Sequence, residues 1–349
     1  MRIESGSPAR LPRFLGVAVL AAALTTGAAT SATATTAPVG HELAALPGGT
    51  TGGAYGIGER GVVVGYSSTA SGANRAVRWD NGVPTDLGTL PGDTDSTAYG
   101  VNRAGTVIGR SVLPGTHNRA VRWDGAGRPT ELPGLPGATI ARGYSINDDG
   151  TAVGISVVAG GYHAMRWSPT GQAAELSPLP GDTGAAAGWV NAAGVVAGFS
   201  LTAEGVARPV LWRPSGAVTR LAVVPGHSSG QSSAISDAGL PVGNSYTPDG
   251  VSHAVRWSLD GRTVTELPAL PGDVGTAAYG VNRDGWVVGW SSTPAGVHRA
   301  VRWSPAGVVS VLPSAGAGAA EAYAVGRNGA VVGFHTAADG RTRATLWAC

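Results

Sequence analysis

Residues 98–141 read AYGVNRAGTVIGRSVLPGTHNRAVRWDGAGRPTELPGLPGATIA, and this stretch decides the fold because the chain repeats it. Aligned with itself, the sequence holds seven copies at a step of about 44 residues, a period typical of propellers, solenoids and other arrays. One such copy cannot bury its hydrophobic face alone, so neighbouring copies must pack together. The sequence therefore predicts a single repeat architecture.

Four positions mark each copy, and each has a physical reason. A turn glycine, as at Gly105, follows polar residues and indicates a hairpin turn with a left-handed backbone. A second glycine four residues later, as at Gly109, lies inside an apolar run, where glycine indicates close approach of a neighbour. A large aromatic residue follows that should be buried, and a proline, usually in Pro-Gly, ends the copy in a type II turn. The aromatic residues are Trp79, Trp123, Trp167, Trp212, Trp257, Trp303 and Trp347.

These marks divide each copy into four short strands, which we name A to D. In the second copy they lie near residues 98–102, 106–112, 119–124 and 129–135, and each is rich in β-branched or aromatic residues. Four antiparallel strands make one propeller blade. The predicted fold is therefore all-β, a seven-bladed β-propeller of four-stranded antiparallel blades.

The two ends of the chain predict how the ring closes. The last copy stops at residue 349 without a strand D, whereas HELAALPGG at residues 41–49 matches the strand D segment TELPALPGD at residues 265–273. We therefore expect residues 42–46 to complete the seventh blade and to leave no open edge strand. An open solenoid would instead need polar caps at both ends.

Residues 1–34 resemble a secretory signal peptide. Arg2, Arg10 and Arg13 form a basic start, residues 14–24 are apolar but too few to span a bilayer, and Ala-Thr-Ala at 32–34 offers a cleavage site near Ala34. Residues 35–40 would be a linker and residues 41–349 the repeat domain. We expect a secreted monomer without membrane attachment after cleavage; an uncleaved N-terminal anchor is the alternative.

Composition and charge narrow the choice of partners. The chain has 24 Lys and Arg against 22 Asp and Glu, and loss of the signal residues leaves it formally neutral. Nucleic acid is therefore not an expected partner, because it demands a basic face. Cys349, the only cysteine, cannot form an intramolecular disulfide and is either inert, a free thiol or an intermolecular link.

Several segments resemble a known family. STAYGVNRAGTVIG at 96–109, HAMRW at 163–167, HAVRW at 253–257 and TDLGTLPGD at 85–93 are similar to the HAF-type extracellular repeat family of exported bacterial proteins. The resemblance covers nearly all of residues 41–349, although Val or Met replaces the Phe of the His-Ala-Phe triplet and Arg replaces the His in most copies. It implies export and repeat structure, and it carries no established activity.

A propeller of this kind presents its B–C loops and D-to-A connections on one face. The B–C loops, such as SSTASGAN at residues 67–74, are long, polar and varied, so we place any ligand site on that face, which we call the loop face. We expect a secreted scaffold that binds an extracellular polysaccharide or protein there. The alternative is an extracellular polysaccharide hydrolase or lyase, which rests on analogy between propeller folds.

A basic or titratable residue stands four positions before every conserved tryptophan of the repeats. These residues either form a cationic ring that binds carboxylates or sulfates of a polysaccharide, or they pair with turn acids such as Asp93, Asp182 and Asp273 or hydrogen-bond loop carbonyls. The ring positions are Arg75, Arg119, His163, Arg208, His253, Arg299 and Arg343.

The remaining patterns are interpreted as scaffold. Five tyrosines of strand A should pack between copies, and arginines directly before the tryptophans should pair across strands C and D with Asp86, Glu131, Glu175 and Glu266. Histidines 117, 163, 253 and 298 belong to different copies and should lie too far apart to share a metal. No catalytic, phosphate-binding or metal-binding motif is present, so we expect no cofactor and no catalytic residue.

Overall fold

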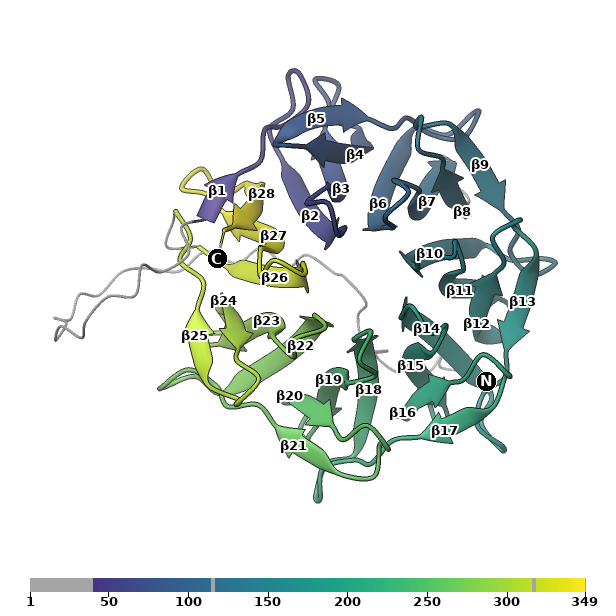
Figure 1. Ribbon diagram of the computed structural model, residues 1–349, viewed down its shortest axis with the longest axis vertical. Helices are drawn as coiled ribbons and strands as arrows, with labels where there is room; N and C mark the ends of the chain where they lie inside the picture. Colours follow the sequence, from purple (N-terminus) through teal and green to yellow (C-terminus); the bar gives the residue numbers. More distant parts are fainter. Residues whose placement is uncertain (1–39, 114–116, 316–317, 349) are drawn as a thin grey trace, which may run out of the picture.

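The computed structural model describes residues 40–113, 117–315 and 318–348, and these residues form 28 β-strands and no helix. The proposed signal peptide, most of the linker and Cys349 lie outside the described residues. The strands form four-stranded antiparallel sheets that stand around a common axis (Figure 1). The all-β, four-strand prediction is thereby confirmed. No helix in the described residues is long and apolar enough to cross a membrane.

Each repeat contributes its four strands in sequence order. The first holds β2 (Gly52–Ile57), β3 (Val63–Ser68), β4 (Asn74–Asp80) and β5 (Val83–Asp86). The second holds β6 (Asp95–Val101), β7 (Val107–Leu113), β8 (His117–Trp123) and β9 (Pro129–Leu132). The third holds β10 (Ile140–Ile146), β11 (Ala152–Val158), β12 (Gly161–Trp167) and β13 (Ala173–Leu176). The fourth holds β14 (Gly184–Val190), β15 (Val196–Leu201), β16 (Ala207–Trp212) and β17 (Val218–Arg220).

The later repeats follow the same order. The fifth holds β18 (Ser229–Ile235), β19 (Pro241–Tyr246), β20 (Ser252–Trp257) and β21 (Val264–Glu266). The sixth holds β22 (Gly275–Val281), β23 (Val287–Ser292), β24 (His298–Trp303) and β25 (Val309–Val311). The seventh holds β26 (Ala320–Val325), β27 (Val331–Thr336) and β28 (Thr342–Trp347), and β1 (Gly40–Glu42) is its fourth strand. A single parallel bridge, Ile140 to Asn118, joins the second and third repeats into one eight-stranded sheet.

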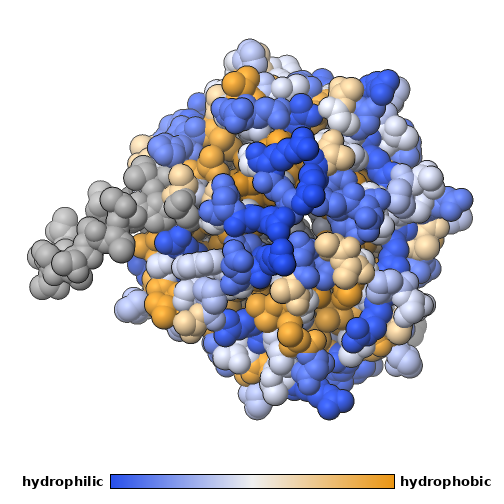
Figure 2. All heavy atoms as spheres, viewed as in Figure 1, coloured by the Kyte–Doolittle hydropathy of each residue, from blue (hydrophilic) through white to orange (hydrophobic). Residues whose placement is uncertain are grey.

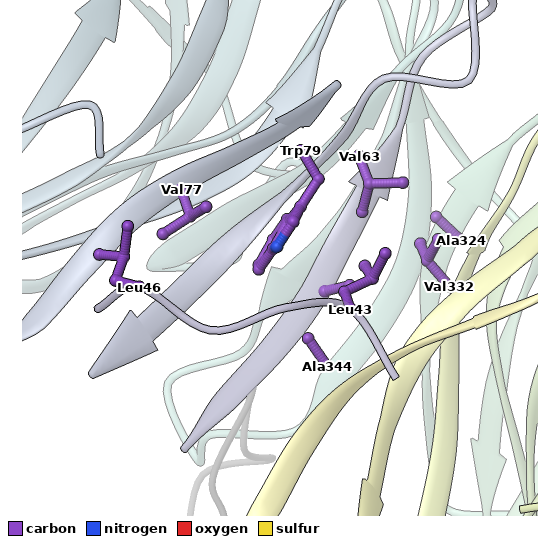
Figure 3. Close-up of a cluster of buried hydrophobic side chains, with 9 residues drawn as sticks. Leu43, Leu46, Val63, Val77, Trp79, Ala324, Val332 and Ala344 are labelled. Atoms are coloured by element: carbon purple, nitrogen blue, oxygen red, sulfur yellow. The ribbon is translucent and has the colours of Figure 1, made fainter. Parts of the chain in front are cut away.

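The N-terminal strand lies two residues earlier than the sequence predicts. Gly40 pairs with Trp347 and Glu42 with Thr345, so β1 covers 40–42 rather than 42–46 and begins inside the expected linker. The reason is packing: Leu43 N–H still bonds Ala344 O of β28, but the chain then leaves the sheet, and Leu43 and Leu46 are buried in one cluster with Trp79 of the first repeat (Figure 3). The segment therefore contacts both the last and the first repeat.

The four marks of each repeat have the roles that their residue types indicate. The seven repeat tryptophans are at most 1% exposed. All of them except Trp123 donate their indole N–H to a carbonyl in the segment preceding strand A of their own repeat, as Trp167 does to Pro133 O at 2.8 Å. A Cβ at Gly109 would lie 2.0 Å from Thr97 O of the adjacent strand A, which explains the glycine. Gly92 has φ 86°, and Asp93 N–H bonds Leu90 O at 3.1 Å, as a type II turn requires.

Candidate functional site

The predicted ring residues lie at the starts of the C strands, and carboxylates neutralise most of them. Arg119 bonds both oxygens of the buried Asp93 at 2.7 and 3.2 Å, and Asp93 raises the pKa of that guanidinium. Arg208 reaches Asp182 at 2.9 Å and Arg299 reaches Asp273 at 2.5 Å. Turn-acid pairing is therefore present wherever the repeat carries the aspartate.

The other ring positions find different partners. His163 lies 2.6 Å from Glu175, His253 lies 3.0 Å from Glu266, and Arg343 lies 2.7 Å from Asp339. In the described structure Arg75 has no carboxylate partner and contacts Thr89 Oγ1 at 3.4 Å. The ring is thus not a row of free cations, and its use in ligand binding stays a prediction.

The expected pairs between strands C and D are wrong, because the register places their members on opposite faces. Val121, not Arg122, stands opposite Glu131. Three of these acids, Glu131, Glu175 and Glu266, bond ring residues instead, as Glu131 does at 2.9 Å from Arg119, whereas Asp86 accepts from Gly88 N–H. Arg122 reaches across to the third repeat and donates to Gly150 O at 3.1 Å and Ser168 O at 3.0 Å. These arginines therefore connect neighbouring repeats.

Five tyrosines form an arc of touching rings across successive repeats, which confirms the expected packing between copies. Neighbouring ring centroids lie 5.1 to 5.5 Å apart. Each tyrosine occupies the bulge of its strand A, where the register with strand B shifts. The arc runs through Tyr279, Tyr323, Tyr55, Tyr99 and Tyr144. The matching bulge residues of the fourth and fifth repeats are Gly188 and Ser233, so the arc is interrupted there.

When the seven repeats are aligned, one position of strand B, which we call a column, holds a different residue in each pair of neighbouring repeats. The positions directly before and after it are nearly constant. The residue before it is always glycine, and the residue after it is serine except at His335. We call this column and its register partners on strand A the variable layer. The strand B members are Tyr66, Arg110, Ile155, Phe199, Asn244, Trp290 and Phe334. Their strand A partners are Gly53, Thr97, Arg142, Ala186, Gln231, Ala277 and Glu321.

Two arginines of the variable layer are half-buried and lack an acidic partner. No carboxylate of the described residues pairs with Arg110 or Arg142, and the Nε of each is buried without a hydrogen-bond partner there. Arg110 donates to Asn118 Oδ1 at 3.2 Å, and Arg142 bonds Tyr144. Burial raises the pKa of Tyr144 to about 12, and the positive charges of both arginines oppose that rise. Both cations therefore lie near one phenol.

The seventh and sixth repeats place an anion with aromatic rings in the same layer. Glu321 lies 2.7 Å from Nδ1 of His298 and accepts a hydrogen bond from the hydroxyl of Tyr323 at 2.9 Å. Burial, and next the charge of Glu321, raises the pKa of Tyr323 well above its ordinary value. Trp290 stacks on His298 at 3.9 Å between centroids. The layer is cationic on one side and anionic and aromatic on the other.

The A–B turns surround a cavity of about 140 Å³ at the opposite end of the axis. Asparagine side chains link the turns from repeat to repeat: Asn102 donates to Asn147 O at 3.1 Å and Asn147 donates to Asn191 O at 3.2 Å. The rim charges are also shared between repeats, since Glu59 accepts from both Arg103 and Arg327. Hydrophilic residues gather over the centre of the ring in Figure 2. These bonds hold the turns together and leave little room for a polymer.

Sequence spacing overlooked one histidine. His227 belongs to a D-to-A connection rather than to a strand C, and its ring lies 4.9 Å from that of His253. One ligand atom of each of His227, His253 and Glu266 falls within 4.8 Å of the others. The turn position that His227 shares with Asp93 is the signal that would have found it.

Comparison with solved structures supports the propeller architecture. TolB from Acinetobacter baumannii superposes with a TM-score of 0.53 and 15% identity over 75% of this chain, which spans only 65% of TolB. Virginiamycin B lyase from Staphylococcus aureus gives a TM-score of 0.56 at 15% identity over 85% of this chain and 95% of that one. Oligogalacturonate lyase from Vibrio parahaemolyticus gives 0.58 at 12% identity, covering 84% and 88%. No family model and no curated protein sequence matches the chain. At these identities the likeness shows the fold alone.

Proposed function

We propose that this protein is an exported, closed seven-bladed propeller that binds an acidic polysaccharide at its loop face. Closure is supported by the pairing of β1 with β28 and by contacts of β2 with β26 and β27. Export is supported by the pattern of residues 1–34 and by the HAF-type repeats. In this proposal the polysaccharide lies outside the cell. The formally neutral mature chain lacks the basic charge that nucleic acid binding requires, so nucleic acid is not the expected polymer.

The observation that carries the binding proposal is the pair Arg110 and Arg142. A half-buried guanidinium loses hydration, and carboxylates compensate the ring arginines Arg119, Arg208 and Arg299 for that loss, whereas the ring residue Arg75 lacks such a partner in the described structure. Arg110 and Arg142 have no such partner among the described residues, so an incoming carboxylate or sulfate completes them. Half-buried Tyr66 and Trp290 in the same layer supply apolar ring surface for sugars.

The test is retention of the mature protein on immobilised polygalacturonate, a sulfated glycan and a neutral glucan. We expect binding to the two acidic polymers that weakens with salt. The variant Arg110→Gln/Arg142→Gln should lose at least tenfold in affinity. The control Arg128→Gln/Arg262→Gln removes the same charge from side chains that are 81% and 86% exposed, and it should bind normally. Equal loss in both variants would mean that only net charge matters and would overturn the site.

A polysaccharide hydrolase or lyase is the second candidate, and one observation favours it. His298, held by Glu321 and covered by Trp290, has the arrangement of an oriented general base. If the protein cleaves the polymer that it binds, His298→Gln should abolish product formation while retention persists. If the unmodified protein is retained on the polymer but releases no product, the enzyme candidate is ruled out and only the binding role remains.

A further inference from the structure

Three potential metal ligands converge on the loop face of the fifth repeat. His227 lies in the connection from β17 to β18, His253 in β20, and Glu266 at the end of β21. Their ligand atoms lie within 4.8 Å of one another, and this is the one such group of three in the part of the chain that the structure describes. The two histidines are half-buried and Glu266 is exposed, so an ion can reach them from solvent.

The sister repeats show what these positions normally hold. His227 N–H bonds Val224 O at 3.0 Å, just as Asp93 N–H bonds Leu90 O at 3.1 Å, so the two residues occupy the same turn position. In the second repeat Arg119 fills the space between Asp93 and Glu131. The fifth repeat keeps the glutamate but replaces both the aspartate and the arginine by histidine. The fifth repeat therefore lacks the arginine side chain that neutralises these acids in the second repeat, and it presents three side chains that can bind a metal ion instead.

The orientation of His227 is already fixed by its neighbour. Its Nδ1 lies 2.9 Å from Ser245 Oγ, and in the fourth repeat the matching Ser200 donates to Asp182 Oδ2 at 2.7 Å. A hydrogen bond from Nδ1–H to Ser245 leaves Nε2 as the lone-pair nitrogen, which is how ligating histidines are held. Because Ser245 Oγ donates to Ser229 O at 3.5 Å, it can accept from Nδ1–H, and the tautomer with a free Nε2 for a metal is available.

We propose that His227, His253 and Glu266 bind a divalent transition metal, Zn²⁺ first among them, with water completing a tetrahedral site. Two imidazoles and one carboxylate suit Zn²⁺ and are a poor set for Ca²⁺ or Mg²⁺, which prefer oxygen ligands. Ligands about 2.1 Å from the ion stand roughly 3.4 Å apart, so the widest separation closes by about 1.4 Å. Partly exposed side chains can make that movement. The inference is independent of the proposed polysaccharide binding.

The test titrates the full mature protein, free of any affinity tag, with Zn²⁺ by calorimetry and with Co²⁺ by visible absorption. We expect one equivalent bound at neutral pH and a rise in melting temperature with Zn²⁺. The variant His227→Asp/His253→Arg restores the pair found in the second, fourth and sixth repeats, so it should fold normally and lose saturable binding. Equal binding by this variant would overturn the proposal, because every other histidine remains.

The third repeat allows a gain of the same site. His163 and Glu175 lie 2.6 Å apart there, and Ala138 occupies the turn position of His227. Ala138→His should therefore add a second equivalent of Zn²⁺ to the otherwise unchanged protein. If stoichiometry stays at one while the fold is intact, the three-position pattern is insufficient and the assignment fails.

Discussion

At the scale of single residues, the repeat positions separate into those that build the scaffold and those that vary upon it. The tryptophans are all buried, yet Trp123 and Trp167 differ in the hydrogen bonding of the indole Nε1. Trp167 Nε1 donates to Pro133 O at 2.8 Å, whereas the buried Nε1 of Trp123 has no partner among the described residues. Identical side chains therefore need not contribute equally to stability.

This difference predicts unequal costs for one substitution. Trp167→Phe should lower the free energy of unfolding more than Trp123→Phe, by about 1 kcal/mol, because only the former breaks a hydrogen bond. Both variants lose the same side-chain volume, so each controls for packing in the other. Urea unfolding of the two proteins measures the difference, and equal costs would refute the role given to the indole N–H.

A second prediction concerns His335, which is 2% exposed and stands where the other repeats have serine. Burial lowers the pKa of His335, and the charge of Glu42 opposes that shift. The unfolded chain therefore binds the proton more readily, so this contribution to stability is complete above about pH 6.5 and falls as the pH decreases towards the folded-state pKa. His335→Ser should flatten the loss of stability between about pH 6.5 and 5. Urea midpoints across that range test it, and parallel curves would argue against it.

At the scale of strands, the sequence predicted the elements well and their register poorly. The alternation of apolar residues between turn signals located A, B, C and D in each repeat. It did not reveal that Val121 rather than Arg122 opposes Glu131, since a shift of one residue moves every side chain to the other face. The variable layer was visible as a changing column between constant glycine and serine, but its meaning needed the neighbouring strand A.

The arginine contacts between repeats give a third prediction. Arg122→Leu should destabilise the protein by about 1–3 kcal/mol, because Gly150 O and Ser168 O would lose their donor in a partly buried place. The fourth repeat has Leu211 at this position, so leucine itself is compatible with the strand. Arg262→Leu, at an exposed arginine, is the control and should change stability by less than about 0.5 kcal/mol. A similar effect of both would remove the bridging role.

At the scale of the whole molecule, the first and last described strands, β1 and β28, pair in one sheet. The unmatched segment at residues 41–49 and the missing last strand D predicted this pairing, and the residue bounds alone needed correction. The turn from sheet to core at Leu43 could not be read from sequence, because it depends on where Trp79 of the next repeat lies.

A fourth prediction follows for truncated chains. Removing residues 1–46 exposes the edge of β28 and the space left by Leu43 and Leu46, so the melting temperature should fall and the protein should self-associate through the free edge. Removing residues 1–39 leaves β1 intact and should change neither property. Differential scanning calorimetry and gel filtration distinguish the two, and equal behaviour would show that β1 contributes nothing.

The place where β1 meets β28 also bears on chain order. Gly40 stands opposite Trp347, so a short peptide can bridge the first and last described strands. New ends can then be opened in an exposed hairpin such as Asn81 and Gly82. A circularly permuted chain would then contain the same sheets in the same cyclic order, so the fold does not depend on which repeat comes first in the gene.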